Sequence, residues 1–238
     1  MSMTELFICD RAETSEPLPE SALALLPPWR RERTERLRRE EARQESLWAG
    51  LLYAYALRRR GVDPMAAVEL LPAGKPVLAG RDDLFFSLSH SGRYVLCAVG
   101  EKAVGADVQI SRPWRGSMER WFHPEERAWL ATIPEEERQR AFYRLWTRKE
   151  AWVKAVSGER MLSLSETDVL RPIPGLCFRD YTLPGGYAAA MCSADDPPEA
   201  PVCVLCAELL HSLWITSLPG RDVICHSLSA NNNKEEKE

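Results

Sequence analysis

Two acidic residues stand in segments whose periodicity would let them share a metal ion. Asp107 lies in Gly-Ala-Asp-Val-Gln, within a strand expected over residues 104–110, so Asp107 and Gln109 should face the same side. Glu150 lies in Trp-Thr-Arg-Lys-Glu-Ala-Trp-Val-Lys, where helical spacing puts Glu150 and Lys154 on one face. Carboxylate oxygens suit hard cations such as Mg²⁺. Each residue also has an ordinary interpretation, because Glu150 and Lys154 have the spacing of a surface ion pair.

A second group of residues is suited to binding phosphate. Lys75 lies between Gly74 and Pro76, which places a cation on a stiff turn. Ser89-His90-Ser91-Gly92 is read as a turn after a strand, where hydroxyls, a protonated imidazole and backbone N–H groups would suit phosphate oxygens. Arginines are dense over residues 30–39, and most of them are interpreted as the solvated face of a helix.

Several enzyme classes are disfavoured by motifs that the sequence lacks. The nucleophile elbow Gly-x-Ser-x-Gly is absent around Ser89 and Ser91. Adjacent residues of a strand or turn point apart, so Ser89 and His90 should not form a nucleophile–base pair. Neither a P-loop lysine motif nor a Gly-x-Gly-x-x-Gly after a strand is present. A hydrolase, a kinase, a P-loop ATPase and a Rossmann enzyme are therefore not expected.

Composition narrows the class of protein further. The 238 residues are 45% hydrophobic and 28% charged, which indicates one globular domain or two small ones. The net charge of −4 argues against a nucleic-acid partner. No apolar run approaches the roughly 20 residues of a membrane span, and no secretory signal is visible. We therefore expect a cytoplasmic protein without a membrane partner, with its seven cysteines reduced.

Cys203 and Cys206 have the spacing of half a zinc ribbon, but no second pair accompanies them.

The hydrophobic pattern predicts the elements that must position these residues. Long helices are expected over residues 30–60 and 136–156, and a shorter helix should begin at His123-Pro124. Asp63-Pro64 is typical of the start of a short helix, here ending near Leu71. Strands are expected over residues 85–88, 94–99, 104–110, 185–191 and 202–207. Each half thus offers a long helix and a few short strands, which indicates an α+β chain of two similar lobes with a cleft between them.

Taken in order, these segments resemble the 4′-phosphopantetheinyl transferases of the surfactin-synthetase-activating type. The resemblance lies in the order and spacing of several short motifs rather than in any one of them. The matching segments are Gly74-Lys75-Pro76, Phe86-Ser87-Leu88-Ser89-His90-Ser91, Gly105-Ala106-Asp107-Val108-Gln109, Trp121-Phe122-His123-Pro124-Glu125-Glu126, and Trp146 to Lys154.

The resemblance implies a fold and a division of the chain. It implies two α+β lobes related by a pseudo-twofold, each with a small antiparallel sheet and a long helix, with coenzyme A between them. Residues 1–103 would form an N-terminal lobe on the adenosine and 3′-phosphate side of coenzyme A. Residues 104–212 would form a C-terminal lobe with the metal and catalytic groups. Residues 213–238 would be an extension, with a disordered end.

The resemblance also implies a reaction. A monomeric enzyme would transfer 4′-phosphopantetheine from coenzyme A to a serine of an acyl or peptidyl carrier protein and release adenosine 3′,5′-bisphosphate. The pathway would be fatty-acid or secondary-metabolite biosynthesis. Asp107, Glu150 and Gln109 would hold Mg²⁺, or Mn²⁺ in its place. Glu150 would take the proton of the serine, and Lys154 would assist the leaving group. The contacts to coenzyme A would come from Lys75, Ser89, His90, Arg43 and Arg31.

Two of the departures from the family pattern concern the predicted site residues. Gln109 stands where glutamate is usual, which removes one negative charge from the metal site. Ser46 stands at or beside the position of an arginine that precedes Leu-x-x-Gly, with Arg43 one turn earlier. A catalytically weak relative that binds coenzyme A or carrier proteins is one alternative. A coenzyme A-dependent acyltransferase, which needs no magnesium, is another. Glu150 and Lys154 are both intact, which favours the transferase.

Overall fold

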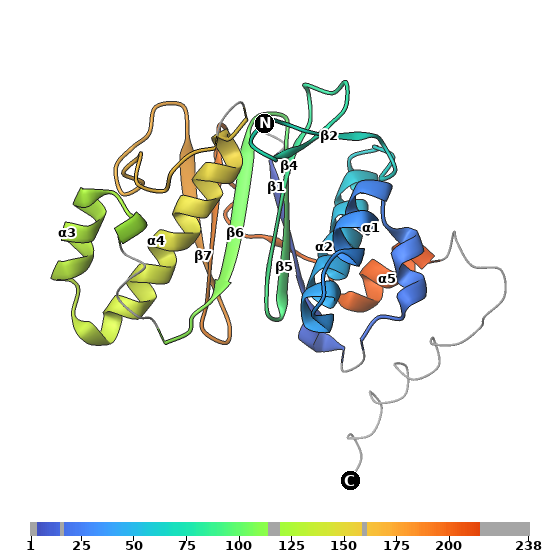
Figure 1. Cartoon of the computed structure of the whole chain (residues 1–238), viewed down its shortest axis with the longest axis horizontal. Coiled ribbons are helices and arrows are strands. Elements are labelled where there is room, and N and C mark those ends of the chain that lie inside the picture. The colour runs from blue at the N-terminus through green and yellow to red at the C-terminus, as the bar shows by residue number, and fades with distance from the viewer. Residues whose placement is uncertain (1–3, 15–16, 114–119, 159–160, 215–238) are drawn as a thin grey trace, which may run out of the picture.

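A computed structural model describes residues 4–14, 17–113, 120–158 and 161–214 (Figure 1). Five strands follow α2, and the long helix α4 lies between β6 and the hairpin of β7 and β8. The elements are β1 (Glu5–Asp10), η1 (Arg11–Glu13), η2 (Glu20–Leu25), α1 (Pro28–Glu35), α2 (Glu40–Arg59), β2 (Val68–Leu70), β3 (Pro76–Leu78), β4 (Phe85–Ser91), β5 (Tyr94–Gly100), β6 (Val104–Ile110), α3 (Pro124–Thr132), α4 (Glu135–Val156), β7 (Cys177–Leu183), β8 (Tyr187–Ser193), β9 (Val202–Cys203) and α5 (Cys206–Trp214).

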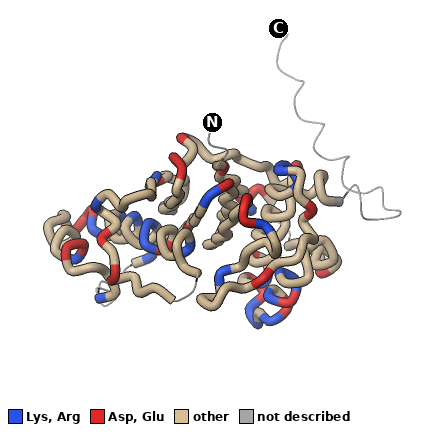
Figure 2. The backbone as a smooth tube through the Cα atoms, turned by 90° about the horizontal axis from the view of Figure 1, so that it is seen from above, with Lys and Arg blue, Asp and Glu red and all other residues tan. Residues whose placement is uncertain are grey.

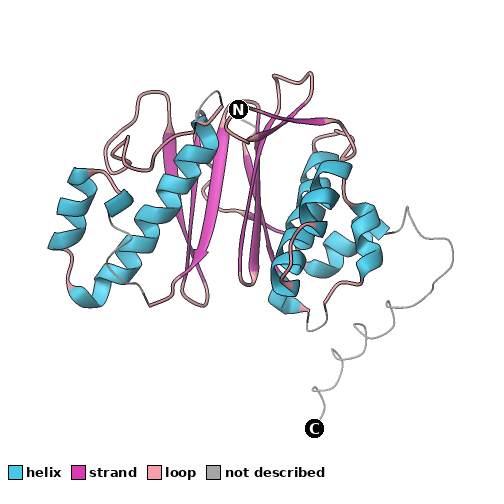
Figure 3. Ribbon diagram, in the orientation of Figure 1, coloured by secondary structure: helices cyan, strands magenta, loops and turns pink. Residues whose placement is uncertain are grey.

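Each half is a small sheet covered on its outer face by a long helix. The first sheet has the strand order β4-β5-β1-β9, and α2 packs on it. The second sheet has the order β6-β8-β7, and α4 packs on it. A two-stranded hairpin, β2-β3, stands apart. The pairs are antiparallel except for β1 and β9, so the predicted α+β class with small antiparallel sheets is confirmed. The strands lie centrally with helices on both outer sides (Figure 3), and both halves carry acidic and basic residues (Figure 2).

The central strand β5 shows how alternation builds two cores from one strand. All of its residues are buried, because side chains on its two faces enter different apolar clusters. Val95, Cys97 and Val99 pack in the core under α2. On the other face, Leu96 and Ala98 pack in a second core that includes residues of β6 and β8. This second core joins the two sheets, so the halves of the chain share buried apolar surface.

Close packing of β6 against α4 depends on one small residue. A Cβ atom added at Gly105 would lie 2.0 Å from the backbone oxygen of Ala151 and 2.5 Å from the nitrogen of Ala155. Any side chain there would push the helix away from the strand. Because Gly105 is two residues before Asp107, this contact brings the carboxylate of β6 up to the face of α4.

The predicted helix over residues 30–60 is wrong in its first part, where the chain forms two helices. The break lies between Glu35 and Glu40, and α1 folds back on α2. Buried polar contacts hold the two together: Arg30 donates to the backbone oxygen of Ser46, and the hydroxyls of Thr34 and Ser46 lie 2.7 Å apart. In one continuous helix Arg30 and Thr34 would lie too far from Ser46 to form these hydrogen bonds. Tertiary contacts therefore outweigh local helix propensity here.

Other elements are closer to expectation, with one more error. The helix predicted over residues 136–156 is confirmed as α4, and α3 begins after a capping box at His123. The strands predicted over 85–88, 94–99 and 104–110 are confirmed as β4, β5 and β6.

The helix predicted after Asp63-Pro64 is wrong. Asp63 instead accepts a hydrogen bond from the backbone of Met65, which forms a tight turn that leads into β2.

The C-terminal segment returns to the first half of the chain. β9 pairs in parallel with β1, and α5 packs on α2, where Leu209 and Leu213 are buried in the first core. Residues 202–212 were expected in the C-terminal lobe, and this part of the division is wrong because the apolar face of α5 completes the other core. The strand predicted over 202–207 ends at Cys203. The predicted disordered end lies outside the described residues.

Two absences in the described part of the chain bear on earlier expectations. No helix there is long and apolar enough to cross a membrane. No group of three or more His, Cys, Asp or Glu side chains in the described ranges is placed to hold a metal ion. Cys206 instead lies beside Cys9, with 3.5 Å between the sulfur atoms, so the interpretation of Cys203 and Cys206 as half a zinc ribbon has no support.

Candidate active site

The buried carboxylate of Asp107 is the centre of the candidate active site. It lies in the middle of β6 and is only 1% exposed. Its Oδ1 atom accepts two hydrogen bonds, from Lys154 Nζ at 2.6 Å and from Ser89 Oγ at 2.7 Å. Lys154 also donates to the backbone oxygen of Ala106 at 3.2 Å. Three elements, β4, β6 and α4, therefore meet at one carboxylate oxygen.

Glu150 lies one helical turn before Lys154 and faces the same carboxylate. Its pKa is raised above the ordinary glutamate value, first by burial and then by the negative charge of Asp107, while Lys154 acts in the opposite direction. A carboxyl group with a raised pKa is better suited to accepting a proton near neutral pH than an ordinary glutamate. The periodicity argument that placed Glu150 and Lys154 on one helix face agrees with this geometry.

Gln109 completes the acidic side of the site. Its Nε2 atom donates to Asp107 Oδ2 at 3.4 Å, as the alternation of β6 requires. The set thus consists of two carboxylates and one carboxamide. Mg²⁺ typically takes one or two protein carboxylates and completes its six positions with phosphate oxygens and water. Two repelling carboxylates fit such an ion, with Lys154 offsetting their charge. Gln109 presents its amide nitrogen to Asp107 in this structure, and rotation of the carboxamide would bring its oxygen to the same place.

His90 lies on the opposite face of β4 from Ser89, as alternation predicts. Its Nδ1 atom is 3.1 Å from Glu45 Oε2 on α2. Glu45 also lies 3.7 Å from Arg11, whose Nε donates to the backbone oxygen of Gly92. Ser89 and His90 therefore do not form a nucleophile–base pair. Nothing in the sequence patterns pointed to Arg11 or Glu45, because both reach this place only through long-range packing.

The predicted turn from Ser89 to Gly92 is wrong in its extent. β4 continues through Ser91, and the turn begins at Gly92, which has a φ of 54° that favours glycine. Ser89 and Ser91 are paired with Leu96 and Tyr94 of β5. The residues therefore present their side chains from a regular strand and not from an open turn.

Lys75 lies at the end of α4 that carries Lys154. Its Nζ atom donates to the backbone oxygen of Ala155 at 2.8 Å, so it caps the helix C-terminus from the β2–β3 hairpin. Burial lowers the pKa of Lys75 to about 8. The bond to Ala155 places Lys75 next to Lys154 at the end of α4. A phosphate bound there would favour the protonated form of Lys75.

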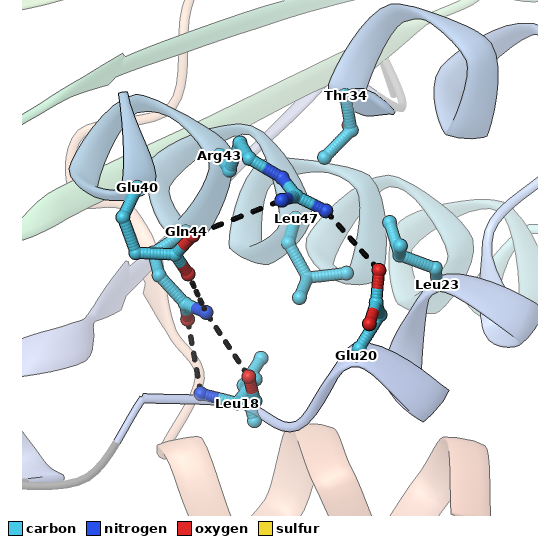
Figure 4. Close-up of a pocket in the computed structure, with 8 residues that line it drawn as sticks. All are labelled: Leu18, Glu20, Leu23, Thr34, Glu40, Arg43, Gln44 and Leu47. Atoms are coloured by element: carbon cyan, nitrogen blue, oxygen red, sulfur yellow. Dashed lines mark hydrogen bonds and ion pairs between the residues drawn. The ribbon is translucent and has the colours of Figure 1, made fainter. Parts of the chain in front are cut away.

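Arg31 and Arg43 do not meet the other predicted residues. Arg31 donates to the backbone oxygens of Leu23 and Ala24 and so holds η2 against α1. Arg43 pairs with Glu20 at 3.5 Å and Glu40 at 3.9 Å. It lines a separate cavity of about 190 Å³ between α2 and the η2 segment (Figure 4). Neither guanidinium contacts Ser89, His90 or Asp107 in the structure.

One ion pair between two of the motif segments is structural and lies outside the candidate site. Lys149 and Glu126 form a fully buried ion pair at 2.7 Å that joins α4 to α3. Glu126 also accepts hydrogen bonds from the backbone N–H groups of His123 and Val169. Lys149 also donates to the backbone oxygen of Thr167. The lysine next to Glu150 in sequence therefore points away from the site and anchors the helix that carries it.

The fold and the site together define a class of protein. An acid pair with a lysine, placed where two small α+β halves meet, is suited to chemistry on a phosphate ester with a bound divalent cation.

Comparisons with known proteins agree with this class and narrow it. The sequence profile described as the 4′-phosphopantetheinyl transferase superfamily matches residues 103–192, which include Asp107, Glu150 and Lys154. The chain is 30% identical over 151 residues to the 4′-phosphopantetheinyl transferase AcpT of Salmonella typhimurium, covering 62% of this chain and 72% of that protein. It is 27% identical over 207 residues to Sfp of Bacillus subtilis, covering 80% and 92%. A further 4′-phosphopantetheinyl transferase of Bacillus subtilis is 28% identical over 184 residues, covering 74% and 80%.

The chain therefore belongs to the 4′-phosphopantetheinyl transferase superfamily. It is a transferase of this class, whose members transfer phosphopantetheine to carrier proteins.

Proposed function

We propose that this enzyme transfers the 4′-phosphopantetheine group of coenzyme A to a serine of an acyl or peptidyl carrier protein. The serine oxygen forms a bond to the phosphorus that bears the pantetheine arm. The bond from that phosphorus to the bridging oxygen of the pyrophosphate breaks, and adenosine 3′,5′-bisphosphate leaves. The observation that carries the proposal is the cluster of Asp107, Glu150 and Lys154 on β6 and α4.

Glu150 accepts the proton of the attacking serine, directly or through one water. Its place on the helix face one turn before Lys154 supports this role, and burial and the neighbouring Asp107 raise its pKa in the metal-free protein. Lys154 offsets the negative charge that develops on the leaving bridging oxygen. Because phosphoryl transfer depends mainly on positioning and charge neutralisation, these two residues of one helix face supply most of what the protein must contribute.

Asp107, Glu150 and Gln109 are the residues that would hold Mg²⁺, or Mn²⁺ in its place. A bound divalent cation would neutralise charge on the pyrophosphate and orient it. The carboxamide of Gln109 can contribute an oxygen but no negative charge.

Coenzyme A contacts are proposed for Lys75, which bonds the residue after Lys154 at the end of α4, and for His90, which follows Ser89 on β4. Arg11 joins them, because it lies beside the His90–Glu45 pair. Arg31 and Arg43 are not included, since their guanidiniums bind backbone oxygens and glutamates elsewhere in the N-terminal half. The protein partner is an apo carrier protein, and the enzyme acts as a monomer.

Incubation with coenzyme A, Mg²⁺ and an apo carrier protein tests the proposal. Intact-protein mass spectrometry should show the carrier gaining the mass of the phosphopantetheine arm, and chelation of the metal should prevent the gain. Acetyl-coenzyme A separates the alternatives, because an acyltransferase would add only an acetyl group and would do so without metal. If several acyl and peptidyl carriers gain no mass, the proposal is wrong and a regulatory binding protein is favoured.

A further inference from the structure

The two sheets meet at their edge strands through side chains. β4 is the edge of the first sheet and β6 the edge of the second, and within the described residues they belong to separate sheets. Three serine hydroxyls of β4 accept hydrogen bonds from backbone N–H groups of β6. These bonds are Ala106 N to Ser87 Oγ at 3.1 Å, Val108 N to Ser89 Oγ at 3.3 Å, and Ile110 N to Ser91 Oγ at 3.1 Å. We call this set of three serines the serine seam.

The serine seam satisfies polar groups that would otherwise be buried without partners. β6 pairs on one side with β8, so its other edge presents N–H groups at alternate residues. Ala106 and Val108 are fully buried, and water does not reach their N–H groups. Because the bonds advance two residues along both strands, they also fix the register of β6 against β4.

Alternation in β4 makes the serine seam possible. Ser87 and Ser89 face β6, while Phe86 and Leu88, which alternate with them, pack into the core under α2. The segment Phe-Ser-Leu-Ser-His-Ser thus has one apolar face for its own half of the chain and one hydroxyl face for the other half.

Ser89 differs from the other two serines because it has a second bond. Its hydroxyl donates to Asp107 Oδ1 at 2.7 Å while accepting from Val108 N. A serine hydroxyl has only one proton, and an ionised carboxylate can only accept. The Ser89 proton is therefore used on Asp107, and no donor remains for a phosphate oxygen.

We propose that Ser89 is a positioning residue for Asp107 and not a contact to coenzyme A, and that Ser87 and Ser91 hold β6 in the same register. Ser89 and Lys154 share Asp107 Oδ1, and Lys154 also binds the backbone oxygen of Ala106 on the same edge of β6. Ser89 thus fixes the orientation of the carboxylate. The register of β6 is shared by three serine bonds and by pairing with β8, so the loss of the Ser87 hydroxyl alone should leave the carboxylate in place. The catalytic consequence rests on the proposed function, whereas the hydrogen bonds do not.

A matched pair of variants tests the proposal. Ser87→Ala and Ser89→Ala each remove one hydroxyl acceptor for a buried N–H group of β6, but only Ser89→Ala also frees Asp107. We expect amide hydrogen exchange, followed by NMR, to speed up at Ala106 in the first variant and at Val108 in the second. We expect kcat to fall by about 10- to 100-fold in Ser89→Ala alone, with the KM for coenzyme A changed less than about twofold. Ser89→Thr, which keeps the hydroxyl, should restore kcat.

Three outcomes would overturn the proposal. A raised KM for coenzyme A with kcat retained in Ser89→Ala would mean that the hydroxyl binds substrate. Equal losses of kcat in Ser87→Ala and Ser89→Ala would mean that the bond to Asp107 has no separate effect. Unchanged exchange at Val108 would mean that the serine seam is absent.

If an alanine variant does not fold, the isosteric Ser89→Cys takes its place. If the wild-type enzyme modifies no carrier, the proposed function fails, and the exchange data alone decide for or against the seam.

Discussion

Lys154 and Asp107 form an ion pair in which Nζ and Oδ1 lie 2.6 Å apart, although 47 positions separate them in the sequence. The pair joins the end of α4 to the middle of β6 and is mostly shielded from solvent. Close packing at Gly105 and the bond from Lys154 to the oxygen of Ala106 set its geometry. A lysine held this way can turn from Asp107 toward a substrate phosphate without leaving the site.

Lys154→Met should lower kcat by about 10²- to 10³-fold, because it removes the cation that offsets charge on the leaving group. Single-turnover transfer to an apo carrier protein measures the effect. Lys102→Met is the matched control, since Lys102 forms a similar lysine–aspartate pair with Asp195 at 2.8 Å on the surface. Transfer at the wild-type rate by the Lys154 variant would remove this residue from the proposed mechanism.

Gln109→Glu should lower the Mg²⁺ concentration needed for half-maximal activity, because it adds a negative charge to a site with two carboxylates. A magnesium titration of the two proteins at saturating coenzyme A measures the change. Mn²⁺ binding followed by electron paramagnetic resonance gives a readout that is independent of turnover. Equal half-saturation in both measurements would mean that residue 109 does not hold the metal.

Glu150→Gln should abolish most activity yet stabilise the metal-free protein at neutral pH. The pKa of Glu150 is raised by burial and by Asp107, so ionisation of Glu150 disfavours the folded state. Protonated Glu150 contributes to the stability of the folded state. That contribution is fully present below the unfolded-state pKa of about 4.3 and is lost as pH rises through the higher folded-state pKa. The loss of kcat should be about 10²- to 10⁴-fold.

Urea denaturation in the presence of a chelator, at pH 7 and near pH 4, checks the stability part. The gain from Glu150→Gln should appear at pH 7 and shrink at the lower pH. A variant that is less stable than the wild type at pH 7 would contradict the assignment of a buried, repelled carboxylate.

Glu45→Gln should tighten coenzyme A binding severalfold, an effect of about 1 kcal/mol. Burial opposes the ionisation of Glu45, but the hydrogen bond and charge of His90 lower its pKa overall. The resulting carboxylate competes with any phosphate for His90 and Arg11. Isothermal titration calorimetry measures the dissociation constant, which should depend on salt.

Glu41→Gln is the control for Glu45→Gln, because Glu41 also lies near Arg11, at 3.5 Å, but its side chain is 76% exposed. We expect little change in that variant. Weaker or unchanged binding by Glu45→Gln would mean that His90 and Arg11 do not contact the phosphates of coenzyme A.

Lys149→Met should reduce the free energy of unfolding by about 3–5 kcal/mol, because it leaves Glu126 as a buried charge without its partner. Urea denaturation measures this value. Arg144→Met, which breaks an exposed pair with Asp180, should cost no more than about 1 kcal/mol. The double variant Lys149→Met, Glu126→Gln should recover part of the loss. Equal small effects for both single variants would show that the buried pair does not anchor α4.

Local periodicity was sufficient to predict the centre of the candidate site. The alternation of β6 put Asp107 and Gln109 on one face of the strand. The helical repeat put Glu150 and Lys154 on one face of α4, the face that meets Asp107. These patterns depend on neighbours two to four residues away, where backbone geometry leaves little freedom. The same reasoning separated Ser89 from His90, and both ends of α4 were predicted to within one residue.

The sequence by itself determined the α+β class, the elements that carry the acids and the family to which the chain belongs. Only the tertiary structure decided that Arg43 lies in a distant cavity, that Glu45 and Arg11 meet His90, and that Ser89 points its proton at Asp107. The physical reason is that a charged side chain has several possible partners within reach. Which of them it meets depends on how helices and sheets pack across the whole chain, and no local period encodes that choice.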